Sequence, residues 1–230
     1  MDSYLAKYSS RYDKWLRETK MEYTSRVIPI KKSLETRQWV MPTQQAISIL
    51  TQAGSFALTE CACRTHYHCD KPKEVCFLLN DVADKAVEKK TARKIDVDEA
   101  IQVLQDAGEA GLVHMTLYRP DQEVFALCNC CSCCCHDLQL LIKYNRTELV
   151  VHSEFIASTN ETLCTDCGQC TENCPFKARN LTDTGLVFES ERCYGCGICV
   201  PMCPENAIEM RKRHELPMLK WSRPTGKNIL

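Results

Sequence analysis

The sequence predicts an α+β fold in two parts. Residues 1–157 are expected to form a mostly helical N-terminal domain with a small β-hairpin. A compact cysteine-rich module follows over residues 158–210, and a basic tail over residues 211–230. Three observations support this division: apolar residues recur at helical spacing in the first half, two short strand-like runs meet at a turn, and a four-cysteine pattern is repeated near the C-terminus.

Several segments of the N-terminal half have the periodicity of amphipathic helices. The segment 96–107 gives the clearest signal, because Asp96 and Glu99 form a capping box ahead of its apolar positions. Gly54 and Pro72 mark the end of one helix and the start of another. The predicted helices cover residues 3–23, 43–53, 72–89 and 96–107, and Cys76 is expected on the third of them.

The predicted hairpin has strands over 112–117 and 123–127, joined by a turn at 119–122. A helix followed by a hairpin can be half of a winged-helix module, which often binds DNA through a basic helix. Here the preceding helix is acidic (Asp98, Glu99 and Asp106), and the net charge of the chain is −1. We therefore expect no nucleic-acid partner.

Composition points to metal or redox chemistry. A chain of 230 residues can bury an ordinary core without disulfides, yet it contains 18 cysteines. No run approaches the roughly 20 apolar residues of a membrane span, and the charged first 25 residues do not resemble an export signal. We expect a cytoplasmic protein, whose thiols stay reduced and are used for metal binding or redox chemistry.

The C-terminal module contains an internal repeat. Four cysteines separated by two, two and three residues recur 29 residues later, and a proline follows each set (Pro175 and Pro204). Three cysteines at two-residue gaps allow a tight loop to wrap three corners of an iron-sulfur cube, so that the fourth ligand must come from elsewhere. Duplication of a half-module explains the pattern most simply.

This module resembles the two-cluster bacterial ferredoxins, in which the fourth cysteine of each run ligates the other cluster. The resemblance implies an electron relay of two 4Fe-4S clusters on a small fold of hairpins and short helices. Two complete copies of the spacing disfavour zinc or disulfides. The implied ligands are Cys164, Cys167, Cys170 and Cys203 for one cluster, and Cys193, Cys196, Cys199 and Cys174 for the other.

A first upstream cysteine group, CACRTHYHCDKPKEVC, begins at residue 61. Two cysteines two residues apart can face the same way from an extended segment, and two later ones can complete a four-thiolate site. We favour an iron-sulfur cluster here, with zinc or no metal as alternatives. His66 and His68 are not expected to be ligands. The candidate ligands are Cys61, Cys63, Cys69 and Cys76.

A second upstream group, CNCCSCCC, covers residues 128–135 and has too many thiols for one four-coordinate ion. Cys128, Cys131 and Cys134 have the same two-residue gaps as the ferredoxin triplets, which favours a third wrapped cube. Cys130, Cys133 and Cys135 are then free for a further cluster, a larger iron-sulfur assembly or a ligand shared with the first group. So many thiols without metal would be prone to oxidation.

The order of the motifs, CxCR, then CNCCxCCC after Gly111–His114, then the two ferredoxin runs, resembles a group of cysteine-rich 4Fe-4S dicluster proteins of anaerobes. This resemblance implies a cytoplasmic redox role and no particular substrate.

The leading hypothesis is an iron-sulfur electron-transfer protein, or a subunit of a hetero-oligomeric redox complex. It would pass electrons between its clusters and an upstream cysteine-ligated centre or a partner oxidoreductase. The partner would be a flavoprotein or metalloenzyme, since the chain has no paired-glycine dinucleotide fingerprint. One alternative is a reductase whose upstream centre is catalytic, with a proton donated by His66, His68, His114 or His136. Another is a redox-sensing regulator.

Overall fold

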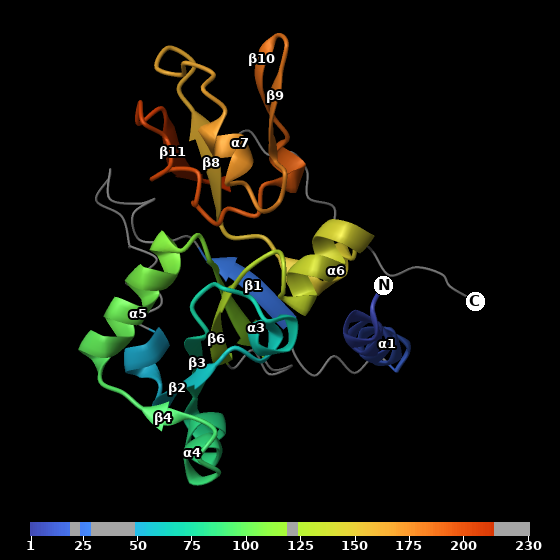
Figure 1. The fold of residues 1–230 in the computed structure, drawn as a ribbon, viewed down its shortest axis with the longest axis vertical. Coiled ribbons are helices and arrows are strands. Elements are labelled where there is room, and N and C mark those ends of the chain that lie inside the picture. Colours follow the sequence, from blue (N-terminus) through green and yellow to red (C-terminus); the bar gives the residue numbers. More distant parts are fainter. Residues whose placement is uncertain (19–23, 29–48, 119–123, 214–230) are drawn as a thin grey trace.

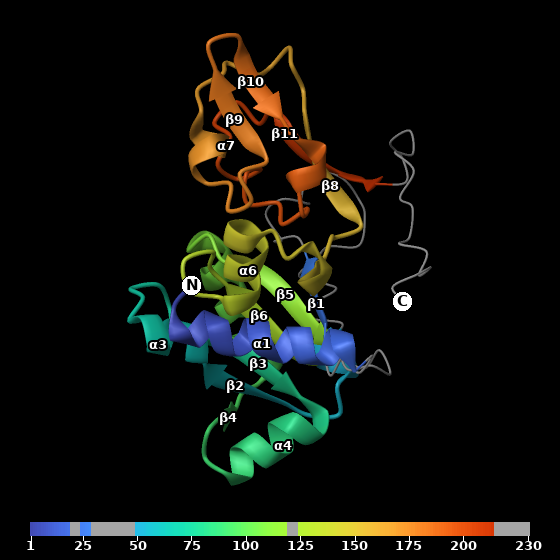
Figure 2. The same cartoon turned by 90° about the vertical axis from the view of Figure 1, so that its right-hand side faces the viewer.

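The computed structural model describes residues 1–18, 24–28, 49–118 and 124–213. Its N-terminal part is built on a seven-stranded sheet, and a smaller module formed by the C-terminal residues stands against one side of it (Figures 1 and 2). Within the described ranges no helix has the length and apolar character needed to cross a bilayer.

The large sheet has the order β4-β2-β3-β6-β5-β1-β7, and all its pairs are antiparallel except β1 with β7. The predicted hairpin is confirmed as β5 and β6, which lie at its centre; the predicted turn lies outside the described residues. The strands are β1 (Thr24–Ile28), β2 (Phe56–Glu60), β3 (Glu74–Leu79), β4 (Arg93–Lys94), β5 (Val113–Tyr118), β6 (Val124–Cys130) and β7 (Val150–Val151).

The N-terminal part is therefore a mixed helix and sheet structure, in place of a mostly helical domain with a small hairpin. One source of the difference is the segment predicted as a helix over 72–89; strands β1, β2, β4 and β7 were also not predicted. The first half of that segment is strand β3, which carries Cys76, and only Asn80–Glu88 is helical, as α4. Val75, Cys76, Phe77 and Leu79 are buried and lie on both faces of the sheet, so the apolar residues show no alternation that would distinguish a strand from a helix.

Helices cover the sheet and the cysteine-rich loops. The predicted capped helix is confirmed as α5 (Val97–Glu109), where the Asp96 side chain accepts a hydrogen bond from Glu99 N at 2.8 Å. Helix α1 (Ser3–Arg17) matches the first prediction up to the undescribed residues and lies across the sheet beside α6 (His136–Tyr144; Figure 2). The short helix α3 (Ala62–Tyr67) was not predicted. Of the helix expected over 43–53, residues 49–52 are described and are helical.

The C-terminal module contains two small antiparallel sheets. Strand β8 (Phe155–Thr159) pairs with β11 (Ile208–Lys212), and β9 (Arg179–Thr182) pairs with β10 (Gly185–Phe188). A short helix α7 (Gln169–Glu172) follows the first cysteines. The module extends slightly beyond the expected 158–210; the domain division stays a prediction, and most of the predicted basic tail lies outside the described residues.

One apolar core joins the two parts. It includes Leu5, Tyr12 and Trp15 of α1, Leu138 and two other residues of α6, and Tyr194, Cys196 and Ile198 of the C-terminal module. Because these side chains form one contiguous buried cluster, the module is packed against α1, α6 and the central strands.

Candidate iron-sulfur and metal centres

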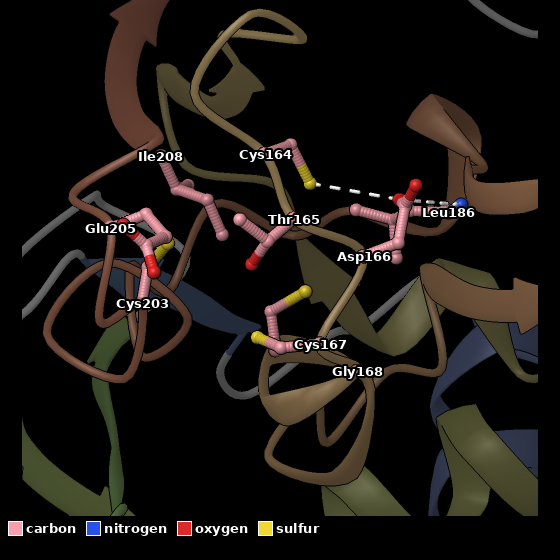
Figure 3. Close-up of a pocket in the computed structure, with 10 residues that line it drawn as sticks. Cys164, Thr165, Asp166, Cys167, Gly168, Leu186, Cys203, Glu205 and Ile208 are labelled. Atoms are coloured by element: carbon pink, nitrogen blue, oxygen red, sulfur yellow. Dashed lines mark hydrogen bonds between the residues drawn. The ribbon is translucent and has the colours of Figure 1, made fainter.

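An outer cavity in the C-terminal module is lined by the four cysteines that the sequence assigned to one cluster, Cys164, Cys167, Cys170 and Cys203. Figure 3 shows the sulfurs of Cys164, Cys167 and Cys203 around the same space. Asp166 fixes the first loop against the β9–β10 hairpin, since its carboxylate accepts a hydrogen bond from Leu186 N at 3.0 Å. Cys167 is exposed, so this cavity lies at the surface.

An inner cavity is lined by the other four cysteines of the module, Cys174, Cys193, Cys196 and Cys199. The last three are buried, and Cys174 is half-buried. The ligand assignment remains a prediction, but its two sets of cysteines surround two separate spaces.

The repeated alanines explain how each fourth cysteine is held. Ala178 N donates a hydrogen bond to Cys174 Sγ, and Ala207 N donates one to Cys203 Sγ, both at 3.3 Å. Backbone N–H groups that donate to sulfur stabilise its ionised form, which is the form that ligates iron. Each alanine follows its cysteine by four residues, so the repeat preserves the donor as well as the ligand.

A buried arginine lies between the two cavities. Arg179 is 2% exposed, and its side chain interacts with Cys170 of the outer cavity and Cys199 of the inner one. Burial raises the pKa of both thiols, that of Cys199 to about 12, and the arginine charge opposes that rise. Arg179 Nη2 is buried without a hydrogen-bond partner in the structure. A negatively charged cluster on either side would satisfy this orphaned donor, so the residues present fit iron-sulfur clusters.

Comparison with known proteins agrees with this geometry. Residues 163–208 match the family model of the 4Fe-4S dicluster domain. This segment is a 4Fe-4S dicluster domain. It covers about a fifth of the chain, and the rest of the chain lies outside the match.

Relatives resemble the chain over the same region. It is 40% identical over 48 residues to a subunit of the ion-translocating oxidoreductase complex of Methanosarcina acetivorans, a match covering 21% of this chain and 18% of that one. It is 41% identical over 54 residues to the pyruvate synthase subunit PorD of Thermotoga maritima, covering 23% of this chain and 54% of that one. The chain therefore spans about half or less of these relatives.

Upstream of the dicluster domain, six thiols form a closed ring. Side-chain interactions join each thiol to its two neighbours, in the order Cys61, Cys63, Cys135, Cys130, Cys128, Cys76 and back to Cys61. The sheet explains part of this ring. Phe77 pairs with Leu127 across the antiparallel strands β3 and β6. Cys76, which precedes Phe77, therefore lies opposite Cys128, which follows Leu127. Cys128 and Cys130 share one face of β6.

In this six-thiol ring, neighbouring thiols have the largest effect on the pKa of each thiol. Each thiol interacts with two neighbouring thiols, so ionisation of one thiol raises the pKa of the thiols beside it. Six thiolates cannot be held together in a buried site without positive charge. A cluster of several metal ions would supply that charge and ligate more than the four cysteines of one cube.

The remaining upstream cysteines form a second group, which packs in the same buried cluster as Cys61 and Cys76 of the ring. The sulfurs of Cys69, Cys131, Cys133 and Cys134 all lie within 4.8 Å of one another. We refer to these residues as the four-thiol site. Cys131 and Cys134 are buried there, whereas Cys133 is exposed.

A second buried arginine links the two upstream sites. Arg64, in the CxCR motif, is fully buried and donates through Nη1 to Asn129 O at 2.9 Å and toward Cys131 Sγ at 3.8 Å. Burial lowers the pKa of Arg64, but its interactions with Cys61, Cys131 and Cys76 raise it. Its Nε and Nη2 are buried without hydrogen-bond partners in the structure. The arginine therefore lies where anionic metal centres on both sides would offset its charge.

The structure redistributes the upstream candidates. Of the first predicted group, Cys61, Cys63 and Cys76 lie together in the ring, whereas Cys69 lies in the four-thiol site. Cys128 joins the ring, whereas Cys131 and Cys134, its partners in the predicted register, do not. Sequence reasoning left open the roles of three cysteines that the structure places in these groups: Cys130, Cys133 and Cys135. The strand alternation of Cys128 and Cys130 was a signal that could have placed Cys130 beside Cys128, whereas Cys133 and Cys135 lie beyond the strand.

Among the histidines considered as proton donors, His136 contacts the ring directly: its Nδ1 lies 3.3 Å from Cys63 Sγ. The Tyr4 hydroxyl donates to the same sulfur at 3.6 Å. His114 has a different role. It is buried and hydrogen-bonded to Asn129, and burial lowers its pKa to about 4, so it stays neutral within the β5–β6 pair.

Proposed function

We propose that this chain is an iron-sulfur electron-transfer subunit, in which electrons pass in a line from the outer cluster to the inner cluster and then to a polynuclear centre in the six-thiol ring, or in reverse. One observation carries the proposal. The apolar core between the two parts contains Cys130 and Cys135 of the ring together with Cys196, and Cys174 packs against it. An inner cluster and a ring centre bound by these cysteines would be joined through one packed core.

The outer cluster is suited to exchange electrons with another protein. Cys167 is exposed, and three large apolar side chains of the dicluster domain, Leu163, Leu181 and Val187, are each between 44% and 51% exposed. Apolar side chains at a surface redox centre favour contact with a partner protein. Two relatives are themselves named as subunits, which supports a place in a hetero-oligomeric oxidoreductase complex. A cytoplasmic flavoprotein or metalloenzyme would suit this role.

Removing one ligand from each set tests the assignment of the clusters. Cys170→Ala should remove the outer cluster, and Cys199→Ala the inner one, because each leaves a cube one thiolate short. Iron and acid-labile sulfide, counted on anaerobically purified full-length protein, should fall by about four atoms each in either variant. The iron of the ring should remain. Full retention of iron in either variant would show that the ligand sets are misassigned.

The order of transfer can be tested on the same variants. A low-potential protein reductant should reduce the ring centre of the wild-type chain quickly, and spectra of the ring centre should follow this in a rapid-mixing experiment. In Cys199→Ala the outer cluster should still be reduced, while reduction of the ring slows by at least an order of magnitude. An unchanged rate for the ring would mean that electrons reach it without the inner cluster.

The second candidate function is a reductase in which the ring centre is catalytic. It is favoured by the Tyr4 hydroxyl and the His136 imidazole, which both lie within hydrogen-bonding distance of Cys63 Sγ. His136→Gln distinguishes the two functions. A relay should keep its iron content and its internal transfer rate, whereas a catalytic ring should lose turnover of its substrate. The regulator hypothesis has less support, since the first turn of α5 carries Asp98 and Glu99.

A further inference from the structure

We propose that Cys69, Cys131, Cys133 and Cys134 bind a single zinc ion, separate from the iron-sulfur centres of the chain. The sulfur of Cys133 lies 3.9 Å from that of Cys69 and 3.6 Å from that of Cys134. All the sulfur separations in the four-thiol site are below 4.8 Å.

These separations suit one ion. Four thiolates about 2.3 Å from a common zinc, in tetrahedral geometry, lie about 3.8 Å from one another. In a 4Fe-4S cube each thiolate is bound to a different iron and points outward, so the sulfurs lie farther apart. The chain provides its own comparison. Over the described ranges, no three cysteines of the dicluster domain, and no three of the six-thiol ring, have sulfurs as close together as those of the four-thiol site.

The backbone delivers the four thiols from two distant segments. Cys69 follows α3, where His68 adopts a left-handed conformation and Cys69 N donates to Arg64 O at 3.1 Å. The other three thiols lie on a tight turn after β6, closed by a hydrogen bond from Cys134 N to Cys131 O at 3.3 Å. Three ligands on one turn and a fourth from another segment make a closed four-coordinate site, which is typical of structural zinc.

The position of the turn indicates what the ion does. The turn lies between Cys130 and Cys135, which both belong to the six-thiol ring. A zinc ion that ties this turn to Cys69 would fix the loop that brings ring thiols to their places. Arg64, 3.8 Å from Cys131 Sγ, would offset the negative charge of a zinc bound by four thiolates.

The test is metal analysis of full-length protein purified without oxygen. Wild-type chain should contain about one zinc per polypeptide, and zinc-edge X-ray absorption should show four sulfurs at about 2.3 Å with no neighbouring iron. Cys133→Ala, which changes an exposed thiol outside the ring, should lose the zinc and keep its iron. Cys69→Ala, on the other segment, should do the same.

The matched control is Cys167→Ala, an exposed cysteine of the dicluster domain, which should keep its zinc and lose iron. Three results would overturn the proposal: zinc retained in both Cys133→Ala and Cys69→Ala, a single iron in place of zinc in wild-type protein, or loss of about four irons in Cys133→Ala. If the electron relay is wrong, the expected zinc content is still one per polypeptide, so the relay and the zinc site are tested independently.

Discussion

Gly195→Ala is expected to prevent the inner cluster from assembling and to destabilise the dicluster domain by more than about 3 kcal/mol. Gly195 has a φ of +73°, which is unfavourable for alanine, and an added Cβ would lie 2.1 Å from the backbone oxygen of Phe155 and 2.9 Å from Ser153 Cβ. The Phe155 oxygen belongs to the backbone, so no side-chain rotation can move it away from the added Cβ. Moving it would break the hydrogen bond from Ser153 N to Tyr194 O, 3.0 Å long.

Gly168→Ala is a matched control, because it has nearly the same φ, +78°, on the loop of the outer cluster. Its added Cβ would meet the end of the flexible Leu181 side chain at 3.3 Å. This variant should therefore cost only the backbone strain, about 1–2 kcal/mol, and keep both clusters. Iron counts and thermal unfolding of the two variants measure the difference. Equal iron in both would mean that the segment 153–155 can yield to a side chain at position 195.

The parts of the molecule predicted correctly are those specified by local spacing. The capping residues of α5 are three positions apart, and the first three cysteines of each run in the dicluster domain are separated by two residues, so neighbouring residues define both patterns. The β5–β6 hairpin is also a local pattern; its turn lies outside the described residues. Each pattern requires only the chain within a few residues of itself.

The upstream sites depend instead on pairings between distant segments. Cys76 meets Cys128 because β3 and β6 pair in one register, and a shift of one strand by one residue would place the two side chains on opposite faces of the sheet. The run CNCCSCCC changes from strand to turn after Cys130, so a two-residue spacing no longer describes which thiols face the same way. The split into a ring and a four-thiol site follows from that change, which the spacing alone does not reveal.

Arg179→Met is expected to lower the reduction potentials of both clusters of the dicluster domain. Arg179 is buried between them and interacts with one cysteine of each set, Cys170 and Cys199. Thr159 and Phe188 hold it there: Nη1 donates to Thr159 Oγ1 at 2.7 Å, and the guanidinium lies 4.7 Å from the centre of the Phe188 ring. Reduction adds a negative charge, which a nearby cation stabilises.

The size of the effect follows from Coulomb's law. A unit charge about 6 Å from a cluster, at an effective dielectric constant of about 20, contributes about 3 kcal/mol, or roughly 120 mV for one electron. Methionine fills much of the same volume without charge, so the domain should still fold. Potentiometric titration followed by EPR should show both potentials shifted downward. Arg179→Lys should keep most of the wild-type values, because it retains the charge.

Arg192→Met is the control for charge at the surface of the same domain. The Arg192 side chain is 47% exposed, so water screens its charge and its loss should move the potentials little. Unchanged potentials in Arg179→Met would mean that this arginine serves packing alone. A downward shift of one potential only would place the guanidinium closer to that cluster. A shift of both would make Arg179 the common electrostatic control of the first two centres in the relay, and with them of the driving force toward the ring.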